Sequence, residues 1–201
     1  MANKTGHTLE DKYLVEKVLG GDTYAFSAIV KNTETLVAQI VFRMVNNAED
    51  RKDIVQDIYL KTFHKLPGFH FGSKLSTWIG QIAYNTCFDY LRKKKLVFLD
   101  NIQGNEEHED EYREERFNGM SEDNIESSFM RKELSGLLKA EIEKIPPIYK
   151  TLVILYHNEE LSYAEIGEIT NLPEGTLKSY LFRARKMLKE NLLAKFKKEE
   201  L

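Results

Sequence analysis

Two groups of side chains in this sequence have the chemistry needed to bind a nucleic acid. Between Lys178 and Lys198 there are eight lysines and arginines and a single acid, Glu190. Such cations neutralise phosphate charge, and polar groups among them can hydrogen-bond to base edges. The second group is the segment 69–74, where Phe69, His70 and Phe71 precede Lys74. Aromatic rings beside positive charge offer stacking surfaces to unpaired bases.

The segment 161–188 has the pattern of a helix-turn-helix, which would position the first group. Ser162 followed by Glu165 predicts a capping box at the start of a short helix. Residues 170–173 predict a four-residue turn, because Pro173 can lead into a second helix. The residues of the first helix expected to face inward are Ala164, Ile166 and Ile169. We also expect the small Ala164 to allow the two helices to cross closely.

The second helix of this motif has one apolar stripe and one polar face. The stripe consists of Leu177, Leu181, Ala184 and Leu188, at helical spacing. The polar face consists of Thr176, Lys178, Ser179, Arg183 and Lys186, whose side chains suit base edges and phosphates. The motif therefore predicts DNA binding, and the alternative is an ordinary helical hairpin with a solvated basic face.

The charge of the chain is strongly segregated, although the formal net charge is only −3. Residues 100–126 contain 11 acids and two arginines, a local net of −9, so the remainder carries +6. This division favours a basic binding surface beside an acidic linker. The 42% hydrophobic and 30% charged residues are typical of a soluble protein. With no membrane-length apolar run or secretory signal, we expect a cytoplasmic protein without direct membrane insertion.

Helical periodicity extends along most of the chain and predicts an all-α fold. The expected N-terminal helices begin at Asp22 and end near Asn46-Asn47, then run over 49–66 until Pro67-Gly68, and over 75–95. Periodicity fails over 96–123, which favours a flexible acidic linker. It returns at Ile125 and breaks at Pro146-Pro147. The fold class predicted is therefore two small helical domains, the second ending in the helix-turn-helix.

Catalytic patterns are missing from the sequence. Five histidines are scattered without metal-ligand spacing, and the phosphate-loop, zinc-protease and serine-hydrolase motifs do not occur. We therefore expect no enzyme activity, no cofactor and no metal. Cys87 is the only cysteine, so it cannot form an internal disulfide and is interpreted as a small buried residue.

Two blocks, taken in order, resemble the extracytoplasmic-function (ECF) group of bacterial RNA polymerase sigma factors. The first comprises GDTYAF, AEDRKDIVQDIYLKTF and FHFGSKLSTWIGQIAYNTCFDYLRKKK. The second is IEKIPPIYKTLVILYHNEELSYAEIGEITNLPEGTLKSYLFRARKML. The sequence departs from the common pattern at Arg51-Lys52, where acidic or apolar residues are more usual, and at Tyr180, where arginine is frequent.

The resemblance implies a sigma factor that binds core RNA polymerase and promoter DNA and promotes transcription initiation. Residues 1–95 would bind the polymerase and open the −10 element, 96–124 would be the acidic linker, and 125–201 would bind the −35 element. The resemblance also implies an anti-sigma protein as a partner. The alternative function is a dimeric helix-turn-helix regulator that binds operator DNA without joining the polymerase.

The resemblance also assigns roles to individual residues. The polymerase-binding residues would be Asp53, Gln56, Asp57 and Leu60. The −10-binding residues would be Phe71, Ser73, Lys74, Trp78, Gln81, Asn85, Arg92 and Lys93. The −35-binding residues would be Ser162, Thr176, Lys178, Ser179, Arg183 and Lys186. For Trp78 the helical stripe with Leu75, Ile79 and Ile82 equally favours core packing, and Phe69 could equally close the core.

The acidic composition of the linker predicts protease sensitivity. Limited proteolysis should yield two stable fragments with ends near 20–95 and 125–196, identified by mass spectrometry. Uniform protection of the linker would contradict two independent domains.

Overall fold

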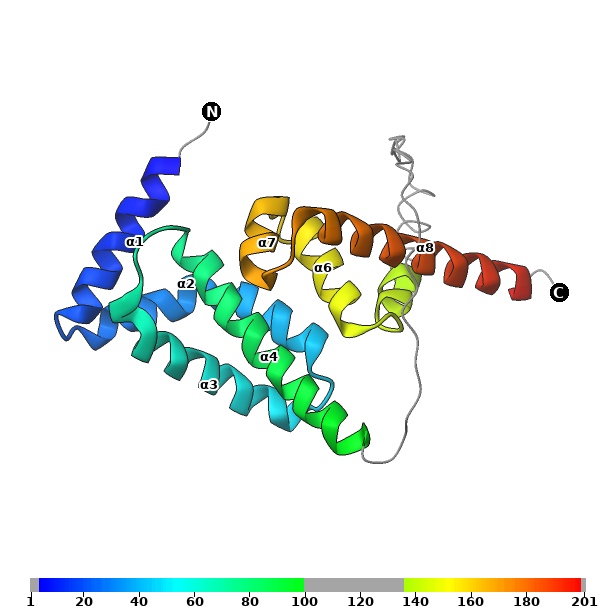
Figure 1. The fold of residues 1–201 in the computed structure, drawn as a ribbon, viewed down its shortest axis with the longest axis horizontal. Coiled ribbons are helices and arrows are strands. Elements are labelled where there is room, and N and C mark those ends of the chain that lie inside the picture. Colours follow the sequence, from blue (N-terminus) through cyan, green and yellow to red (C-terminus); the bar gives the residue numbers. More distant parts are fainter. Residues whose placement is uncertain (1–3, 100–135, 200–201) are drawn as a thin grey trace.

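The computed structural model describes residues 4–99 and 136–199, and every regular element in those ranges is helical. The elements are α1 (Lys4–Leu19), α2 (Thr23–Met44), α3 (Ala48–Lys65), the 3₁₀ turn η1 (Leu66–Gly68), α4 (Leu75–Leu99), α6 (Pro147–His157), α7 (Tyr163–Thr170) and α8 (Glu174–Glu199). A further helical stretch covers 136–142. The all-α fold class is confirmed, and the arrangement is shown in Figure 1. Residues 100–135, and with them most of the expected linker, lie outside the described ranges.

The starts of the first long helices follow from their capping residues. The Asp22 carboxylate accepts hydrogen bonds from the backbone N–H groups of Tyr24 and Ala25, which fixes the start of α2 as expected. Asn47 caps α3 in the same way by accepting from Glu49, so α3 begins at Ala48. An acceptor at this position satisfies a backbone donor that has no partner inside the helix.

Helix α4 is longer than the sequence predicts. It continues through 96–99 and ends at Leu99, so placing the start of the linker at Leu96 was wrong by four residues. Leu, Val, Phe and Leu follow the basic run there, and none of them breaks a helix. The spacing of apolar residues that is typical of a buried helix face ends at this point of the sequence. A helix can nevertheless continue beyond the part that has such a face.

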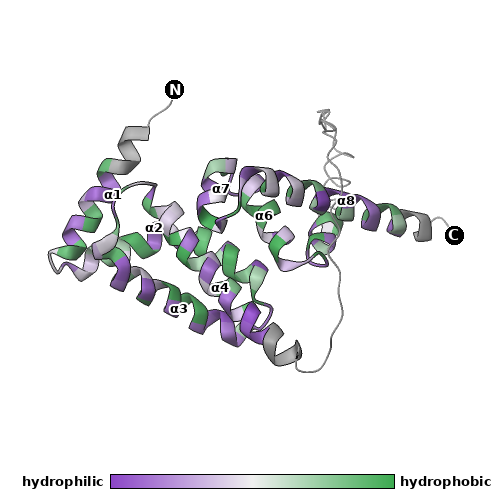
Figure 2. Ribbon diagram, in the orientation of Figure 1, coloured by the Kyte–Doolittle hydropathy of each residue, from purple (hydrophilic) through white to green (hydrophobic). Residues whose placement is uncertain are grey.

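The C-terminal helices form around two prolines and the helix-turn-helix. Pro146 precedes α6, and Pro147 is its first residue, where a missing N–H costs nothing. Six residues of α6, 150–155, are buried, and Figure 2 shows this helix as largely hydrophobic. The predicted stripe of α8 is confirmed: its four residues are at most 8% exposed.

The helix-turn-helix differs in two details from the expectation. Thr170 still belongs to α7, so the turn has three residues, and it begins with Asn171 in the left-handed region at φ 57°. Ala164 is exposed rather than inward, whereas Ile166 and Ile169 are buried as expected. The close approach occurs at Gly167, where an added Cβ would lie 3.3 Å from the Leu172 carbonyl oxygen. The small residue that the motif requires is therefore Gly167.

The two groups of helices pack against each other instead of standing apart. Helix α7 lies on α4, and α6 lies on α2, so one buried cluster runs through both groups (Figure 1). The closest point is Gly80 in α4, where an added Cβ would lie 3.1 Å from Ile169 and 3.3 Å from Leu36. Because Gly80 has no side chain, the Ile169 side chain of α7 can lie directly against the backbone of α4.

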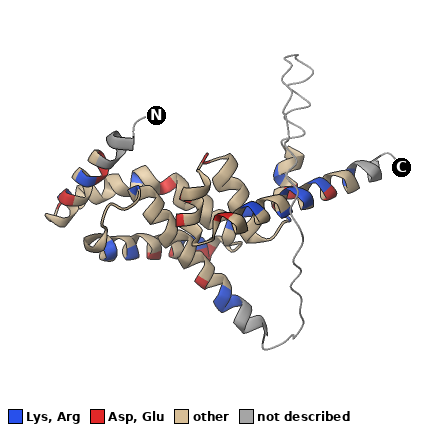
Figure 3. Ribbon diagram, turned by 45° about the horizontal axis from the view of Figure 1, so that its top comes forward, with Lys and Arg blue, Asp and Glu red and all other residues tan. Residues whose placement is uncertain are grey.

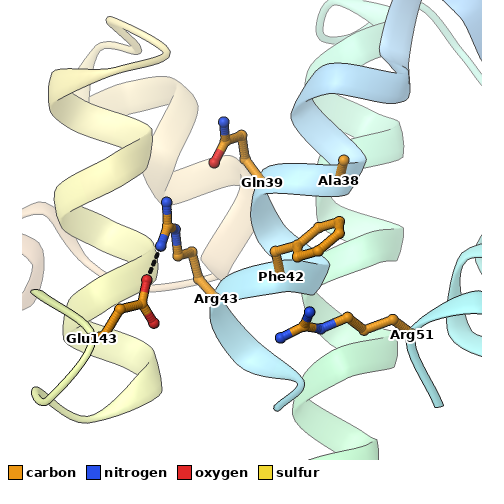
Figure 4. Close-up of a pocket in the computed structure, with 6 residues that line it drawn as sticks. All are labelled: Ala38, Gln39, Phe42, Arg43, Arg51 and Glu143. Atoms are coloured by element: carbon orange, nitrogen blue, oxygen red, sulfur yellow. Dashed lines mark hydrogen bonds and ion pairs between the residues drawn. The ribbon is translucent and has the colours of Figure 1, made fainter. Parts of the chain in front are cut away.

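A polar bridge lies at another edge of this interface. The Arg43 guanidinium in α2 pairs with the carboxylate of Glu143, which also accepts a hydrogen bond of 3.0 Å from the buried ammonium of Lys150. Figure 4 shows Arg43 and Glu143 beside an open cavity of about 410 Å³. In the same cavity the Arg51 guanidinium lies 4.4 Å from the centre of the Phe42 ring. Glu143 thus pairs with one cation from α2 and one from α6 at this interface.

Replacing Leu181 with alanine should destabilise the fold by about 2–5 kcal/mol, because Leu181 is 1% exposed and its removal leaves a cavity. The exposed Lys189 on the same helix is the control, and Lys189→Ala should change stability by less than about 0.5 kcal/mol. Urea unfolding followed by circular dichroism measures both. Equal effects of the two substitutions would contradict the assignment of the buried stripe.

Candidate nucleic-acid interface

The basic face of α8 is accessible along the helix. Lys178 and Lys186 are exposed, and Thr176, Ser179 and Arg183 are half-buried. Lys and Arg recur along α8 (Figure 3), and Lys178 makes an ion pair of 2.9 Å with Glu174 one turn earlier. Such a pair between exposed side chains is weak, so it does not prevent the ammonium from reaching a phosphate. These residues therefore lie where a nucleic acid could reach them.

A cluster of aromatic rings and cations flanks this helix, and the sequence did not predict it. The Tyr156 and Tyr163 rings stack with centroids 5.1 Å apart. The Lys178 ammonium lies 5.7 Å from the Tyr163 centroid, and the Arg185 guanidinium lies 5.8 Å from that of Tyr156. These contacts orient two basic side chains of α8 against α6 and α7. The tyrosines are on different helices, so no single periodic pattern reveals the pairing.

The predicted capping box at the start of α7 is confirmed. The Ser162 hydroxyl accepts from the Glu165 N–H, and the Glu165 carboxylate accepts from the Ser162 N–H at 2.9 Å. The same carboxylate forms an ion pair of 2.7 Å with Lys74 from the N-terminal helices. Burial alone would raise the pKa of Glu165, but the hydrogen bonds from Lys74 and Ser162 outweigh it and lower the pKa to about 2. Glu165 therefore both starts α7 and holds a residue of the predicted −10 site.

The loop 69–74 is held by a cluster of aromatic rings. Phe69 is 7% exposed, which confirms that it closes the core, and its ring lies 4.8 Å from that of Phe71 and 5.0 Å from that of Trp78. Trp78 is half-buried, while Leu75, its neighbour on the stripe, is buried. Phe71 has φ 56°, a left-handed conformation that is uncommon for a residue with a large side chain. The loop thus presents Phe71, Ser73 and Lys74 from a fixed backbone.

The other predicted −10 residues are spread along α4 rather than gathered in one cluster. The Gln81 amide donates to the Asn171 side-chain oxygen at 2.8 Å, so it faces the C-terminal helices. Asn85, Arg92 and Lys93 are exposed, and Arg92 pairs with Asp89 at 3.1 Å. Lys74 and Arg92 are separated by about 27 Å along the helix at 1.5 Å per residue. Such a line of polar groups could contact a single DNA strand that runs along the helix.

The predicted polymerase-binding residues share one face of α3. Asp53, Gln56, Asp57 and Leu60 are all exposed, at positions that recur once per helical turn. Asp57 makes an ion pair of 2.7 Å with Lys61, and the leucine side chain is 52% exposed. Phe63, one turn further along, is 44% exposed. A face combining carboxylates with exposed apolar side chains suits a protein partner better than a nucleic acid.

The described residues contain no group of three or more His, Cys, Asp or Glu side chains that could hold a metal ion. Cys87 is fully buried as expected, and burial raises the pKa of its thiol to about 12. Within the parts that the structure covers, no helix combines the length and apolarity needed to cross a membrane.

Comparison with known proteins identifies both blocks. The family model described as sigma-70 region 2 matches residues 29–97, and that described as sigma-70, region 4 matches residues 135–188. The ECF RNA polymerase sigma factor SigW of Bacillus subtilis is 33% identical over 182 residues, which cover 90% of this chain and 96% of SigW. The ECF RNA polymerase sigma-E factor of Haemophilus influenzae is 32% identical, with 92% and 96% covered.

Solved structures share the fold. CnrH in complex with the cytosolic domain of CnrY superposes with a TM-score of 0.60 at 18% identity, covering 92% of this chain and 98% of that one. The sigma factor RpoE in complex with the anti-sigma factor NepR, from Bartonella quintana, gives a TM-score of 0.58 at 22% identity, with 83% and 96% covered.

The two matched regions, in this order and in this all-helical fold, define a sigma-70-type transcription protein. Within that class, the chain belongs to the ECF group of RNA polymerase sigma factors, which recognise promoters.

The low pKa of Glu165 makes the stability of the chain depend on pH. Because this pKa lies below the ordinary value of 4.5, the ionised carboxylate favours the folded state above about pH 4.5, and this stabilisation is lost as pH falls toward about 2. Glu165→Gln should therefore cost about 1 kcal/mol at pH 7 and progressively less in acid, as measured by urea unfolding. Glu168→Gln, an exposed acid on the same helix, controls for loss of a charge. A deficit independent of pH would contradict the role of the carboxylate.

Proposed function

We propose that this sigma factor divides its work between three surfaces. The exposed face of α3 binds core RNA polymerase, the loop 69–74 and α4 open and read the −10 element, and α8 reads the −35 element. The observation that carries the proposal is that each matched region folds into helices exposing side chains suited to its role. The N-terminal unit extends to Leu99, the end of α4, and the C-terminal unit contains α6, α7 and α8.

The −10 chemistry requires capture of unpaired bases. Phe71 and Trp78 are both half-buried, so each keeps part of its ring surface accessible beside the exposed Lys74. Stacking on such rings stabilises a base by about 1–3 kcal/mol, and a cation nearby attracts the phosphate backbone. The basic side chains further along α4, Arg92 and Lys93, extend the positive surface for the same strand.

The −35 chemistry requires a helix that fits the major groove. The N-terminal part of α8 carries Thr176, Lys178 and Ser179, and its buried stripe holds the helix against α6 and α7. In a helix-turn-helix the first residues of the second helix approach base edges, while the first helix crosses the backbone. Ser162 is exposed at the N-terminus of α7, the first helix of this motif.

Simultaneous reading of both elements requires the closed packing to open. The positions −10 and −35 are about 25 base pairs apart, which is roughly 85 Å of duplex at about 3.4 Å per base pair. In the closed arrangement Gln81 is hydrogen-bonded to Asn171, and Lys74 is paired with Glu165. Both contacts must break before α4 can bind the −10 element while α8 binds the −35 element. A partner favours the open form only by binding it more tightly than the closed one, so core polymerase or DNA would have to contact surfaces that the α4–α7 packing covers.

An anti-sigma protein is the expected regulatory partner. The two solved structures of similar fold both contain a bound partner, and NepR is described as an anti-sigma factor. A soluble partner or the soluble part of a membrane protein would meet this chain in the cytoplasm, where core polymerase and promoter DNA are found. The proposed activity is binding and promoter opening, without catalysis by this chain.

Substitutions on α3 and α8 should fail in different assays. Asp57→Ala should weaken capture of core polymerase in a pull-down, because it removes a carboxylate from the proposed docking face. Lys178→Ala and Arg183→Ala should leave capture unchanged and weaken run-off transcription, since a lost base or phosphate contact costs about 1–3 kcal/mol. Both α8 residues lie outside the buried stripe, so circular dichroism should show an intact fold.

The controls are Glu34→Ala, an exposed acid on α2, and Lys139→Ala, an exposed base in the helical stretch 136–142 rather than on α8. Both should behave like the unmodified protein in each assay. If Asp57→Ala and Arg183→Ala fail in the same assay, or if the unmodified protein captures no core polymerase, the division of labour is wrong. A dimeric regulator would then explain the helix-turn-helix better.

A further inference from the structure

Helix α1 has no role in the function proposed so far. The sigma-70 region 2 match begins at residue 29, after α1 has ended at Leu19. Yet α1 packs on α2 and reaches η1, next to the loop 69–74. Val15 and Val18 are 1% and 7% exposed, so the face that carries them is fixed in the core. Asp11 lies on that same face, because it precedes them by four and seven residues.

The Asp11 carboxylate contacts the first turn of α4. It accepts a hydrogen bond of 3.1 Å from the backbone N–H of Leu75, a residue 64 positions later in the chain. The Lys74 carbonyl accepts from the Trp78 N–H at 3.1 Å, so Lys74 occupies the capping position of α4. A lysine ammonium can only donate, so it cannot accept from the first N–H groups of the helix. Asp11 supplies from α1 the acceptor that the capping residue lacks.

Burial makes this hydrogen bond important. Leu75 is only 2% exposed and its hydrogen bond to Asp11 is part-buried, so its backbone N–H would be costly to leave without an acceptor. The negative charge of Asp11 also lies at the N-terminus of α4, where the helix dipole favours an anion. Both effects favour one position for the start of α4 relative to α1.

The start of α4 is also the end of the loop 69–74. The first end of this loop is fixed by the buried ring of Phe69, and its middle has the left-handed Phe71. Ser73 and Lys74, two of the proposed −10 residues, lie directly before the hydrogen bond to Asp11. If that bond is lost, the backbone at the end of the loop has lost its contact with α1. The ring cluster and the ion pair of the Lys74 side chain with Glu165 remain, so the final backbone residues of the loop gain freedom.

We propose that Asp11 is a positioning residue for promoter opening: by accepting from the Leu75 N–H, it holds Ser73 and Lys74 in the geometry that captures the unpaired −10 strand. This inference rests on the proposed function of the loop and α4. It extends the opening machinery to α1, outside the segment matched by the family model.

The test compares Asp11→Ala, Asp11→Asn and Glu16→Ala in holoenzyme assembled with core polymerase, on a promoter selected by run-off transcription. Glu16 is an exposed acid on the same helix and serves as the matched control. Permanganate reactivity of unpaired thymines measures opening, and pull-down measures core capture. We expect Asp11→Ala to reduce the opening rate by about 10-fold, the effect of losing one charge-assisted hydrogen bond to a partly buried donor, with unchanged core capture. Asp11→Asn should retain most of the rate, because its amide oxygen still accepts.

Amide hydrogen exchange over residues 69–78 of the free protein gives a second readout that does not depend on transcription. Asp11→Ala should accelerate exchange there, whereas Asp11→Asn and Glu16→Ala should not. Normal opening by Asp11→Ala, equal failure of the alanine and asparagine variants, or loss of core capture together with opening would each overturn the proposal. Failure of the unmodified holoenzyme to open any promoter would instead overturn the proposed function, while the exchange measurement would still report the hydrogen bond.

Discussion

The contact of α7 with α4 at Gly80 is the constraint on which the arrangement of the described helices depends. Helix α4 packs against α2, α3 and α7, and Gly80 is the point where Leu36 and Ile169 both come close to its backbone. Any larger side chain there must displace one of these neighbours, since the interior is closely packed. Helix α7 therefore packs against the N-terminal helices through α4, and it also contacts α8 and α6.

This packing gives the two proposed DNA-reading surfaces unequal access. Lys178 and Lys186 on α8 remain exposed in the closed form, but Lys74 and Gln81 are engaged by α7 and the turn that follows it. The polar contacts at this seam are partly exposed and individually weak. A closed form stabilised mainly by apolar contact around Gly80, with weak polar contacts beside it, can exchange with an open form when polymerase or DNA offers a competing surface.

The periodic features of the fold could be predicted from the sequence, because each depends on neighbours within one or two helical turns. The caps at Asp22 and Ser162 and the buried stripe of α8 are of this kind. Contacts between distant segments could not be predicted. Ala164 has the right size for a close crossing but lies on the exposed side of α7, so Gly167 takes that part. The Asp11–Leu75 and Gln81–Asn171 hydrogen bonds join segments whose proximity follows only from the tertiary fold. The residues assigned to polymerase binding are exposed on one face of α3, and their role in that binding stays a prediction.

The burial of Cys87 has a practical consequence for observing the domains in motion. It is the only cysteine of the chain, it is fully buried in α4, and burial raises the pKa of its thiol to about 12. Thiolate is the species that attacks maleimide dyes, so the native thiol is almost inert toward them at neutral pH. A pair of cysteines introduced on the exposed faces of α3 and α8 can thus carry a donor and an acceptor fluorophore without replacing Cys87. Energy transfer between the two dyes would then report the distance between α3 and α8 without a contribution from dye on Cys87.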